Sequence, residues 1–251
     1  MDRPGCLLVH GYGGTPFEME GIAAALAGAG YAVNNLCLPG HGQDRDRFRE
    51  TRFHHWLDHA ENAYSAMLAR HGRVFLLGFS MGGALALNIA ARRGAAGVMT
   101  ISAVVYVMQI LPWPLVNARF YRDSLKVRVR KLLPFSPPVG DTGETSQDIA
   151  PWKGYTGRLN FPQLWSFRKG CAQTRDLLPS LTAPLCVMHD VGDKLVYVGN
   201  AWEVARRASS ERTEIRLTRM RETITSHHMV PTHRETAVFA ASEAVRFAQS
   251  L

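Results

Sequence analysis

The strongest constraint on the fold is an alternation between short, unbroken apolar runs and segments with helical patterning. The apolar runs cover residues 6–9, 74–77, 97–101 and 185–188, and polar residues do not alternate within them. Strands of this kind are buried on both faces, as in parallel sheets that are covered by helices. The alternation therefore predicts a right-handed, doubly wound α/β sheet.

Helix signals lie between the apolar runs. Thr15 and Glu18 have the spacing of a capping box with Pro16 at the first helical position, and Thr232 and Glu235 repeat that spacing near the C-terminus. The predicted helices cover 15–28, 53–71, 80–93, 197–209 and 232–251. Residues 213–218 alternate apolar and polar side chains, which predicts an edge strand with one face toward water.

Composition places the chain among ordinary globular domains. It has 251 residues, of which 46% are hydrophobic and 20% charged, so a disordered or fibrous chain is excluded. The four cysteines lie far apart without a CxxC pair, and we expect them to be small buried residues. The apolar run near the N-terminus is too short for a signal peptide, so we expect a cytoplasmic protein.

Residues 104–176 interrupt the alternation. This connection is much longer than the few residues usual in such folds, so we expect a lid inserted into a core formed by 1–103 and 177–251. The segment has eleven Lys or Arg against five Asp or Glu, which accounts for +6 of the net charge of +8. The basic run 124–131 is typical of a solvated face, or could rest transiently on an anionic lipid surface. Nucleic acid is not an expected partner, because no aromatic platform accompanies the charge.

The motif Gly78-Phe79-Ser80-Met81-Gly82 lies between a predicted buried strand and a predicted helix. A tight strand-to-helix turn needs positions without side chains on either side of the serine, and the two glycines supply them. The hydroxyl of Ser80 then projects above the sheet as a candidate nucleophile. The alternative is an ordinary helix-capping serine after a glycine turn.

A serine hydroxyl needs an imidazole to take its proton and a carboxylate to orient that imidazole. Asp193 follows a buried strand by five residues, and Asp190 is the weaker candidate because it lies at the strand end. His227 and His228 occupy the loop before the last helix. The resulting order of serine, acid and histidine is the one expected of α/β-hydrolases.

The oxyanion of a tetrahedral intermediate needs two N–H donors. One candidate is the amide of Met81 at the start of a helix, and the other is the amide of Tyr12 in the bend His10-Gly11-Tyr12-Gly13-Gly14. We expect His10 to order this bend through backbone hydrogen bonds. The glycine spacing fits neither of the usual phosphate-binding motifs.

Five further histidines are expected to have no catalytic function. His41, in a Pro-Gly-His-Gly turn, is expected to stabilise that turn, with substrate contact as the alternative. His189 ends a buried strand and is expected to be a hydrogen-bonded core residue. The histidines at 54, 55 and 59 crowd one helical turn, but no cysteine or carboxylate geometry accompanies them as a zinc site requires.

Taken together, these motifs resemble the successive signatures of α/β-hydrolases, most closely bacterial carboxylesterases and monoacylglycerol lipases. The motifs are His10–Gly14, Leu38–Gly42, Gly78–Gly83, Ala183–Leu185, Asp193 and Ser226–His228. The resemblance implies a catalytic triad of Ser80, Asp193 and His228, no cofactor and no metal. It departs from the family at His227 and Asp190, where glycine is usual. It also implies a mainly parallel sheet of about six strands that lacks the first two strands of the fold.

The expected function is hydrolysis of small carboxylic esters, of short to medium acyl chain or monoglyceride type, through an acyl-enzyme. The residues expected to contact substrate are Tyr12, Phe79, Trp113 and Val196. The apolar segment 104–116 suits contact with an acyl group. The alternatives are cleavage or transfer of other acyl bonds (thioester, lactone or carbon–carbon), because fold does not fix substrate, and a non-catalytic binding module. Oligomeric state has no signal in the sequence.

Overall fold

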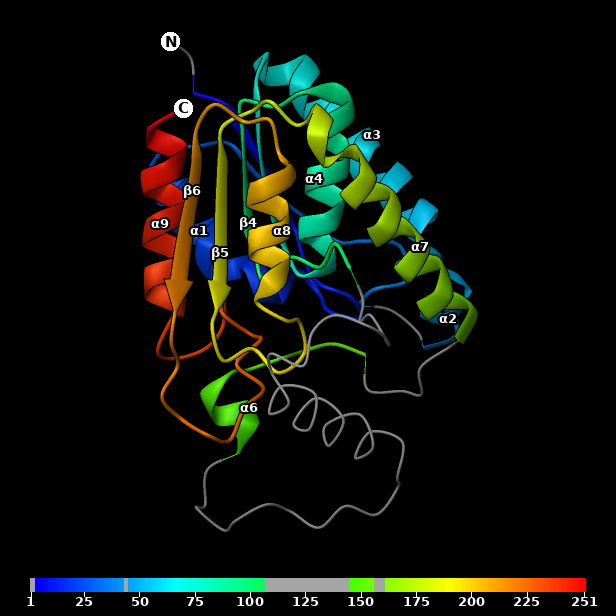
Figure 1. The fold of residues 1–251 in the computed structure, drawn as a ribbon, viewed down its shortest axis with the longest axis vertical. Helices are drawn as coiled ribbons and strands as arrows, with labels where there is room; N and C mark the ends of the chain where they lie inside the picture. Colours follow the sequence, from blue (N-terminus) through cyan, green and yellow to red (C-terminus); the bar gives the residue numbers. More distant parts are fainter. Residues whose placement is uncertain (1–2, 43–44, 107–144, 156–160) are drawn as a thin grey trace.

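The computed structural model describes residues 3–42, 45–106, 145–155 and 161–251. Within these residues, six strands form one parallel sheet in the order β2-β1-β3-β4-β5-β6 (Figure 1). The strands are β1 (Gly5–Val9), β2 (Val33–Leu36), β3 (Val74–Phe79), β4 (Gly97–Ile101), β5 (Leu185–Asp190) and β6 (Thr213–Thr218). The predicted fold class is confirmed.

Helices cover both faces of this sheet (Figure 1). On one face, α1 (Glu20–Gly28) packs against α9 (Ala237–Gln249). On the other lie α3 (Phe53–His71), α4 (Met81–Arg93) and α8 (Gly199–Arg207), with α7 (Phe161–Leu177) packed on α3 and α4. The other helices of the described residues are short: α2 (Arg45–Glu50), α6 (Ser146–Ile149) and two 3-10 helices (Pro16–Met19 and Leu178–Ser180).

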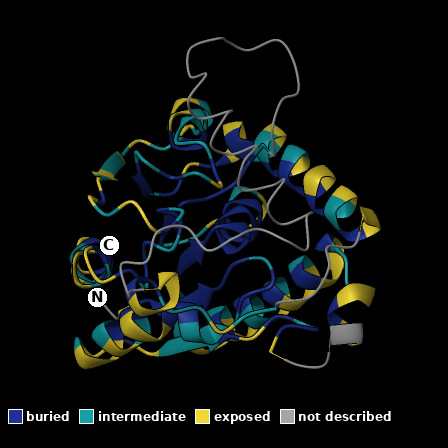
Figure 2. Cartoon of the chain, turned by 90° about the horizontal axis from the view of Figure 1, so that it is seen from below, coloured by how far each residue is buried: buried dark blue, intermediate teal, exposed yellow. Residues whose placement is uncertain are grey.

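The strands divide their side chains between two separate cores. Leu7 and Val9 of β1 pack beneath α3 and α4, whereas Cys6 and Leu8 of the same strand pack beneath α1 and α9. Successive strand residues point to opposite faces, so a strand covered on both sides must be apolar throughout. Figure 2 shows these strands buried and the outward faces of the helices exposed. The unbroken apolar runs in the sequence follow from this packing.

Strand β6 lies at the edge of the sheet, as predicted, but its polar face is not turned to water. Glu214 and Arg216 point toward α9, where they form ion pairs with Glu243 and Arg246. The apolar face is the more open one, since Leu217 is 44% exposed. One face of the strand therefore meets water as expected, but it is the apolar face, because α9 supplies opposite charges that partly cover the charged one.

Both predicted capping boxes are absent. Thr15 makes no capping hydrogen bond with its side chain, and the residues after it form a 3-10 helix before α1 begins. The hydroxyl of Thr232 has no hydrogen-bond partner among the described residues, and α9 begins only at Ala237. The carboxylate of Glu235 instead accepts a hydrogen bond from the backbone amide of Arg221. Spacing alone therefore misassigned both acidic residues.

The cysteines are not all buried. Cys6, Cys171 and Cys186 are buried, as predicted, and burial raises the pKa of the Cys6 thiol to about 12. Cys37 is exposed, so the expectation is wrong for this residue. It directly follows β2, a strand in which three of the four side chains are only partly covered. No helix in the described part of the chain has the length and apolar composition that a bilayer span requires.

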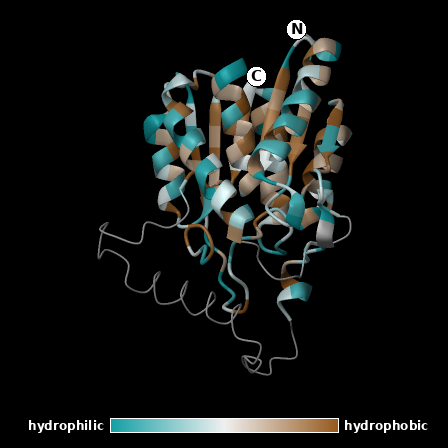
Figure 3. Ribbon diagram, turned by 90° about the vertical axis from the view of Figure 1, so that its right-hand side faces the viewer, coloured by the Kyte–Doolittle hydropathy of each residue, from teal (hydrophilic) through white to brown (hydrophobic). Residues whose placement is uncertain are grey.

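The carboxyl ends of the six strands meet along one edge of the sheet, toward the bottom of Figure 1. The loops that follow β1, β3, β5 and β6 lie at this edge, and α6 and the residues that follow it lie below them. Apolar side chains concentrate in the strands, and the helices turn polar residues outward (Figure 3). The basic run 124–131 and Trp113 of the predicted lid lie outside the described residues, and the proposed division into core and lid stays a prediction.

Candidate active site

Ser80 lies in a sharp turn between β3 and α4. Its backbone adopts φ 53° and ψ −115°, a region that non-glycine residues seldom occupy. A Cβ atom on Gly78 would overlap the backbone of Gly82, and one on Gly82 would overlap the carbonyl of Val9. Gly78 is therefore required by the tightness of the turn itself, and Gly82 by the close approach of the turn to β1. The Ser80 amide donates to the Ile101 carbonyl at 2.8 Å, which ties the turn to β4.

Three side chains that are far apart in the sequence form one hydrogen-bonded chain. His228 Nε2 lies 3.0 Å from Ser80 Oγ, and His228 Nδ1 lies 2.7 Å from Asp193 Oδ2. A carboxylate at Nδ1 favours the tautomer in which Nδ1 is protonated, which leaves Nε2 as the acceptor for the serine hydroxyl. All three residues are buried. The arrangement can move a proton from the serine to the imidazole.

Asp193 is fixed by contacts to both of its oxygens. Oδ1 accepts the backbone amides of Leu195 at 2.8 Å and Val196 at 2.9 Å. Burial alone would raise the pKa of Asp193, but the charge of His228 and the hydrogen bonds from His189 and His228 lower it to about 2. The carboxylate therefore stays ionised at any pH at which the protein works, as orienting an imidazolium requires.

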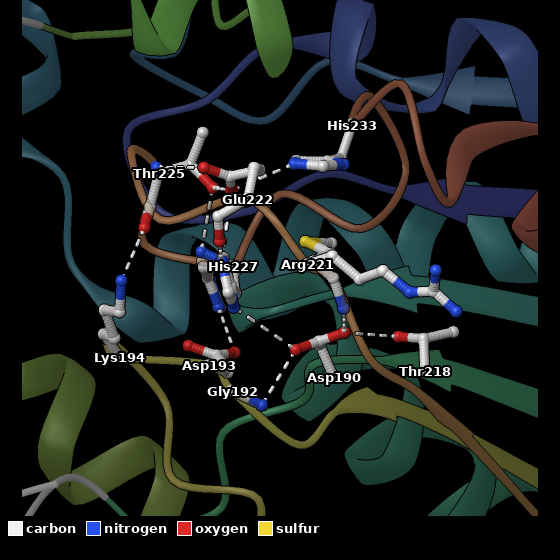
Figure 4. Close-up of polar contacts among 12 residues, drawn as sticks. Asp190, Gly192, Asp193, Lys194, Thr218, Arg221, Glu222, Thr225, His227 and His233 are labelled. Carbon is white, nitrogen blue, oxygen red and sulfur yellow. Dashed lines mark hydrogen bonds and ion pairs between the residues drawn. The ribbon is translucent and has the colours of Figure 1, made fainter. Parts of the chain in front are cut away.

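Asp190 and His227, the two less favoured candidates, do not take part in the hydrogen-bonded series of Ser80, His228 and Asp193. Asp190 accepts hydrogen bonds from the amides of Gly192 and Met220 and from the hydroxyl of Thr218 (Figure 4). It stabilises the loop that carries Asp193. His227 has φ 57°, and its Nε2 lies 2.6 Å from the Glu222 carbonyl.

His227 belongs to a second polar cluster that supports the loop of His228. The carboxylate of Glu222 accepts the Thr225 amide at 2.8 Å, and its Oε1 lies 3.2 Å from His233 Nε2 (Figure 4). Burial would raise the pKa of Glu222, but its hydrogen bonds to Thr225 and His233 lower it to about 2. The carboxylate thus organises the turn that precedes His228. Sequence analysis did not single out Glu222.

The bend after β1 has one backbone amide without an acceptor. Gly11 N–H donates to Glu18, Gly13 N–H to His41 Nε2 at 3.1 Å, and Gly14 N–H to the Gly11 carbonyl at 3.1 Å. Among the described residues, no acceptor is found for the amide of Tyr12. Among the described contacts of the bend, the Tyr12 N–H is therefore the one that can donate to an oxygen atom of a bound molecule.

The second expected donor is the amide of Met81. Met81 is the first residue of α4, and the first N–H groups of a helix have no acceptor within the helix. They also carry the positive end of the helix dipole, which favours a negative oxygen.

Two buried histidines hold the bend in place, as the sequence predicts for His10. His10 Nε2 accepts the Leu38 amide at 3.1 Å, so Nδ1 carries the proton that it donates to the Gly11 carbonyl at 2.9 Å. His41 Nδ1 donates to the Pro39 carbonyl at 3.1 Å, which supports its turn role. Burial lowers the pKa of His10 to about 4 and that of His41 to about 3, so both are neutral at pH 7.

The residues expected to contact substrate occupy different environments. The Tyr12 hydroxyl donates to Gln163 Oε1 at 2.6 Å, and its ring packs edge-on against Trp56. Phe79 is buried, with its ring centroid 5.1 Å from that of His228. Val196 is buried and its amide is used by Asp193. Trp113 lies outside the described residues.

Sequence reasoning missed Glu18 and the part that His189 plays at Asp193. His189 is a buried, hydrogen-bonded residue as predicted, with Nε2 3.0 Å from the Val196 carbonyl, but it also lies beside the carboxylate of Asp193. Its position four residues before the acid was the available signal. In the part of the chain that is described, no group of three or more His, Cys, Asp or Glu is arranged to hold a metal ion.

The parallel sheet, the strained serine turn and the serine–histidine–aspartate chain together define an α/β-hydrolase. Comparison with known proteins gives the particular family: the chain belongs to the serine aminopeptidase S33 family, whose model matches residues 2–220. The predicted resemblance to carboxylesterases and monoacylglycerol lipases is confirmed. The chain is thus a hydrolase of the α/β class.

A relative and two solved structures agree with this assignment. A thermostable monoacylglycerol lipase from Bacillus sp. (strain H-257) is 31% identical over 217 residues, which cover 84% of this chain and 79% of the relative. A structure of the metagenome-derived lipolytic enzymes LipS and LipT has a TM-score of 0.77 at 20% identity, covering 100% of this chain and 95% of the other. A monoacylglycerol lipase from Paleococcus ferrophilus has a TM-score of 0.72 at 16% identity, with 100% and 96% covered. The two structures support the fold.

Proposed function

We propose that the protein hydrolyses carboxylic esters of small molecules, of short to medium acyl chain or monoglyceride type, through an acyl-enzyme. The observation that carries this proposal is the hydrogen-bonded chain from Ser80 through His228 to Asp193, with His228 Nε2 3.0 Å from Ser80 Oγ. This hydrogen-bonded triad can activate a hydroxyl, and it lies at the end of the sheet where the Tyr12 amide has no acceptor among the residues that the structure describes. The 31% identical relative supports the monoglyceride type of substrate.

In the first half of the proposed reaction, Ser80 Oγ attacks the acyl carbonyl carbon and its proton passes to His228 Nε2. The carbonyl oxygen becomes an oxyanion, which accepts hydrogen bonds from the amides of Tyr12 and Met81. Asp193 orients the imidazole and stabilises its positive charge. When the tetrahedral intermediate collapses, the alcohol leaves with the proton from His228, and the acyl group stays on the serine.

In the second half, a water molecule attacks the acyl-enzyme while His228 Nε2 takes one of its protons. The second tetrahedral intermediate uses the same two amides. Its collapse releases the carboxylic acid and returns the proton to Ser80 Oγ. The cycle needs no group beyond the side chains and amides already named.

We also propose that residues 104–176 form an inserted lid, in which α7 anchors the segment on α3 and α4 while the part before α7 covers the site and its apolar residues contact the acyl group. The described part of that segment reaches the bend after β1, because the Tyr155 amide donates to the Gly13 carbonyl at 2.6 Å. This contact joins the segment to the bend that carries the Tyr12 amide. The preference of the enzyme for a given acyl-chain length is then expected to depend on the lid.

The test is a substrate panel run with the parent protein and with Ser80→Ala. We expect the parent to cleave p-nitrophenyl esters and monoacylglycerols, and Ser80→Ala to lose at least about 10⁴-fold in kcat while it keeps its melting temperature. Aminoacyl p-nitroanilides and acyl-thioesters in the same panel separate ester hydrolysis from cleavage of other acyl bonds. Cleavage of thioesters or anilides without cleavage of oxygen esters would contradict the proposal.

A further inference from the structure

Glu18 is a buried carboxylate that the proposed reaction does not use. Glu18 is only 2% exposed. Each of its carboxylate oxygens accepts a hydrogen bond, and the two donors come from different parts of the chain. Oε2 accepts the backbone amide of Gly11 at 2.8 Å, and Oε1 accepts the indole N–H of Trp152 at 2.6 Å. The carboxylate therefore joins the bend after β1 to a turn in the segment between β4 and β5.

That turn is packed directly on the bend. A Cβ atom on Gly154 would overlap the Gly13 carbonyl, and a Cβ atom on Gly14 would overlap the carboxylate of Glu18. The Tyr155 amide donates to the same Gly13 carbonyl at 2.6 Å. No room is left for the bend to shift without breaking these contacts.

The Gly11 N–H, which donates a hydrogen bond to Glu18, is one residue before the Tyr12 N–H. We propose that Glu18 is a positioning residue, whose carboxylate fixes the bend so that the Tyr12 N–H points at the oxyanion, with the Trp152 indole fixing the carboxylate in turn. This inference rests on the proposed function, because it assumes that an oxyanion forms at this site. It assigns a function to Glu18 and Trp152 together.

The chemistry explains why a carboxylate is needed at this position. Two N–H donors converge on the side chain, and only an ionised carboxylate offers an acceptor to each. Glutamine has the same shape but one acceptor, so its NH2 group must face one of the two donors. Burial raises the pKa of Glu18 to about 7, while the hydrogen bonds from Gly11 and Trp152 and the charge of His228 act to lower it. The two donors oppose the effect of burial, and with this pKa the carboxylate is mostly ionised above about pH 7, which is the range for the assays below.

The decisive experiment is a double-mutant cycle with Glu18→Gln and Trp152→Phe. We expect Glu18→Gln to lower kcat about 10-fold with KM within about twofold, because a misdirected oxyanion donor weakens the transition state and not ground-state binding. Trp152→Phe removes the donor that glutamine cannot satisfy. The double variant is therefore expected to recover kcat to within about threefold of the parent, which loss of packing would not do.

Controls separate positioning from folding. Glu20→Gln changes an exposed carboxylate two residues away and is expected to leave kcat and KM unchanged. Rates are expressed per active site, counted by reaction of Ser80 with a fluorophosphonate, so unfolded protein is not scored. If the parent is not labelled at Ser80, the proposed function itself fails. If labelling is normal, the result bears on Glu18 alone.

Two results would overturn the proposal: kcat of Glu18→Gln within twofold of the parent, or a double variant no faster than Glu18→Gln. Should Glu18→Gln fail to fold, Trp152→Phe alone still tests the idea. It leaves one oxygen of the carboxylate without its donor, and we expect kcat to fall about threefold with KM unchanged. An unchanged kcat in Trp152→Phe would count against the proposal.

Discussion

His189 Nε2 lies 3.3 Å from Asp193 Oδ2, the same oxygen that is bonded to His228. Both side chains of this pair are fully excluded from solvent. The carboxylate that orients His228 is therefore flanked by a second imidazole, which is held by the Val196 carbonyl at 3.0 Å. This contact gives a buried strand-end histidine a part in the electrostatics of the site.

We predict that His189→Phe lowers the free energy of unfolding by about 1–3 kcal/mol, because the Val196 carbonyl is left without its donor in the interior. The carboxylate of Asp193 also loses a neighbouring donor, and we expect kcat to fall about fivefold. His189→Gln keeps an N–H near the position of Nε2 and serves as the matched control. Urea denaturation and ester hydrolysis measure the two effects, and equal values for the Phe and Gln variants would contradict the account.

The two adjacent histidines are predicted to behave differently. His228→Asn removes the base and is expected to lower kcat by about 10³-fold or more. His227→Asn keeps a side chain that tolerates positive φ, and its nearest polar contact is the Glu222 carbonyl, so we expect kcat within about threefold of the parent. Steady-state kinetics of both variants on one aryl ester decide the matter. A larger loss in His227→Asn than in His228→Asn would reverse the assignment.

His41 is predicted to make the fold sensitive to mild acid. Burial lowers its pKa in the folded protein from the ordinary 6.5 to about 3. The His41 side chain therefore binds a proton near pH 6.5 in the unfolded chain but only near pH 3 in the folded chain. The free energy of unfolding falls as the pH drops below about 6.5. Between pH 7 and pH 5 this amounts to about 2 kcal/mol.

The variant His41→Gln keeps an acceptor for the Gly13 amide but cannot titrate. Its free energy of unfolding is expected to fall by about 2 kcal/mol less than that of the parent between pH 7 and pH 5. Urea denaturation at the two pH values measures the difference. Equal losses in parent and variant would show that His41 is not buried in its neutral form.

The turn at Ser80 is predicted not to tolerate a methyl group. In Gly82→Ala the new Cβ meets the carbonyls of Val9 and His10, which belong to the backbone and cannot move aside. We expect a loss of about 3 kcal/mol in stability together with activity. Gly21→Ala is the control: Gly21 lies in α1 with nothing near its Cβ position, so a gain of up to ~1 kcal/mol is expected. Thermal denaturation compares the two.

The sheet could be predicted because its central strands are apolar on both faces. The serine turn could be predicted because its two glycines each lie only two residues from Ser80 in the sequence. Strand β2 was harder: the sequence contains Asn34 and Asn35, and three of its four side chains are only partly covered. Its presence was implied only by the turn at His41. Asp193 and His228 were found through chain order and their place after strands, since parallel strands end at one edge.

Glu18 could not be found in the same way. Its spacing from Thr15 fits a helix cap, and only the folded chain brings the indole of Trp152 next to it. His228, the partner of Asp193, is also distant in sequence. Glu222 is bonded to Thr225 and His233 of the same loop, but loops have no periodic pattern that would report such contacts. Buried polar networks depend on which loops meet, and periodicity carries no information about that.

The most direct test of the central claim is the site of covalent labelling by a fluorophosphonate, read by mass spectrometry of the intact protein and of its peptides. The account predicts one adduct per folded chain, located on Ser80, with loss of ester hydrolysis in proportion to labelling and none in Ser80→Ala. A folded parent protein that hydrolyses esters but carries no adduct on Ser80 would contradict it.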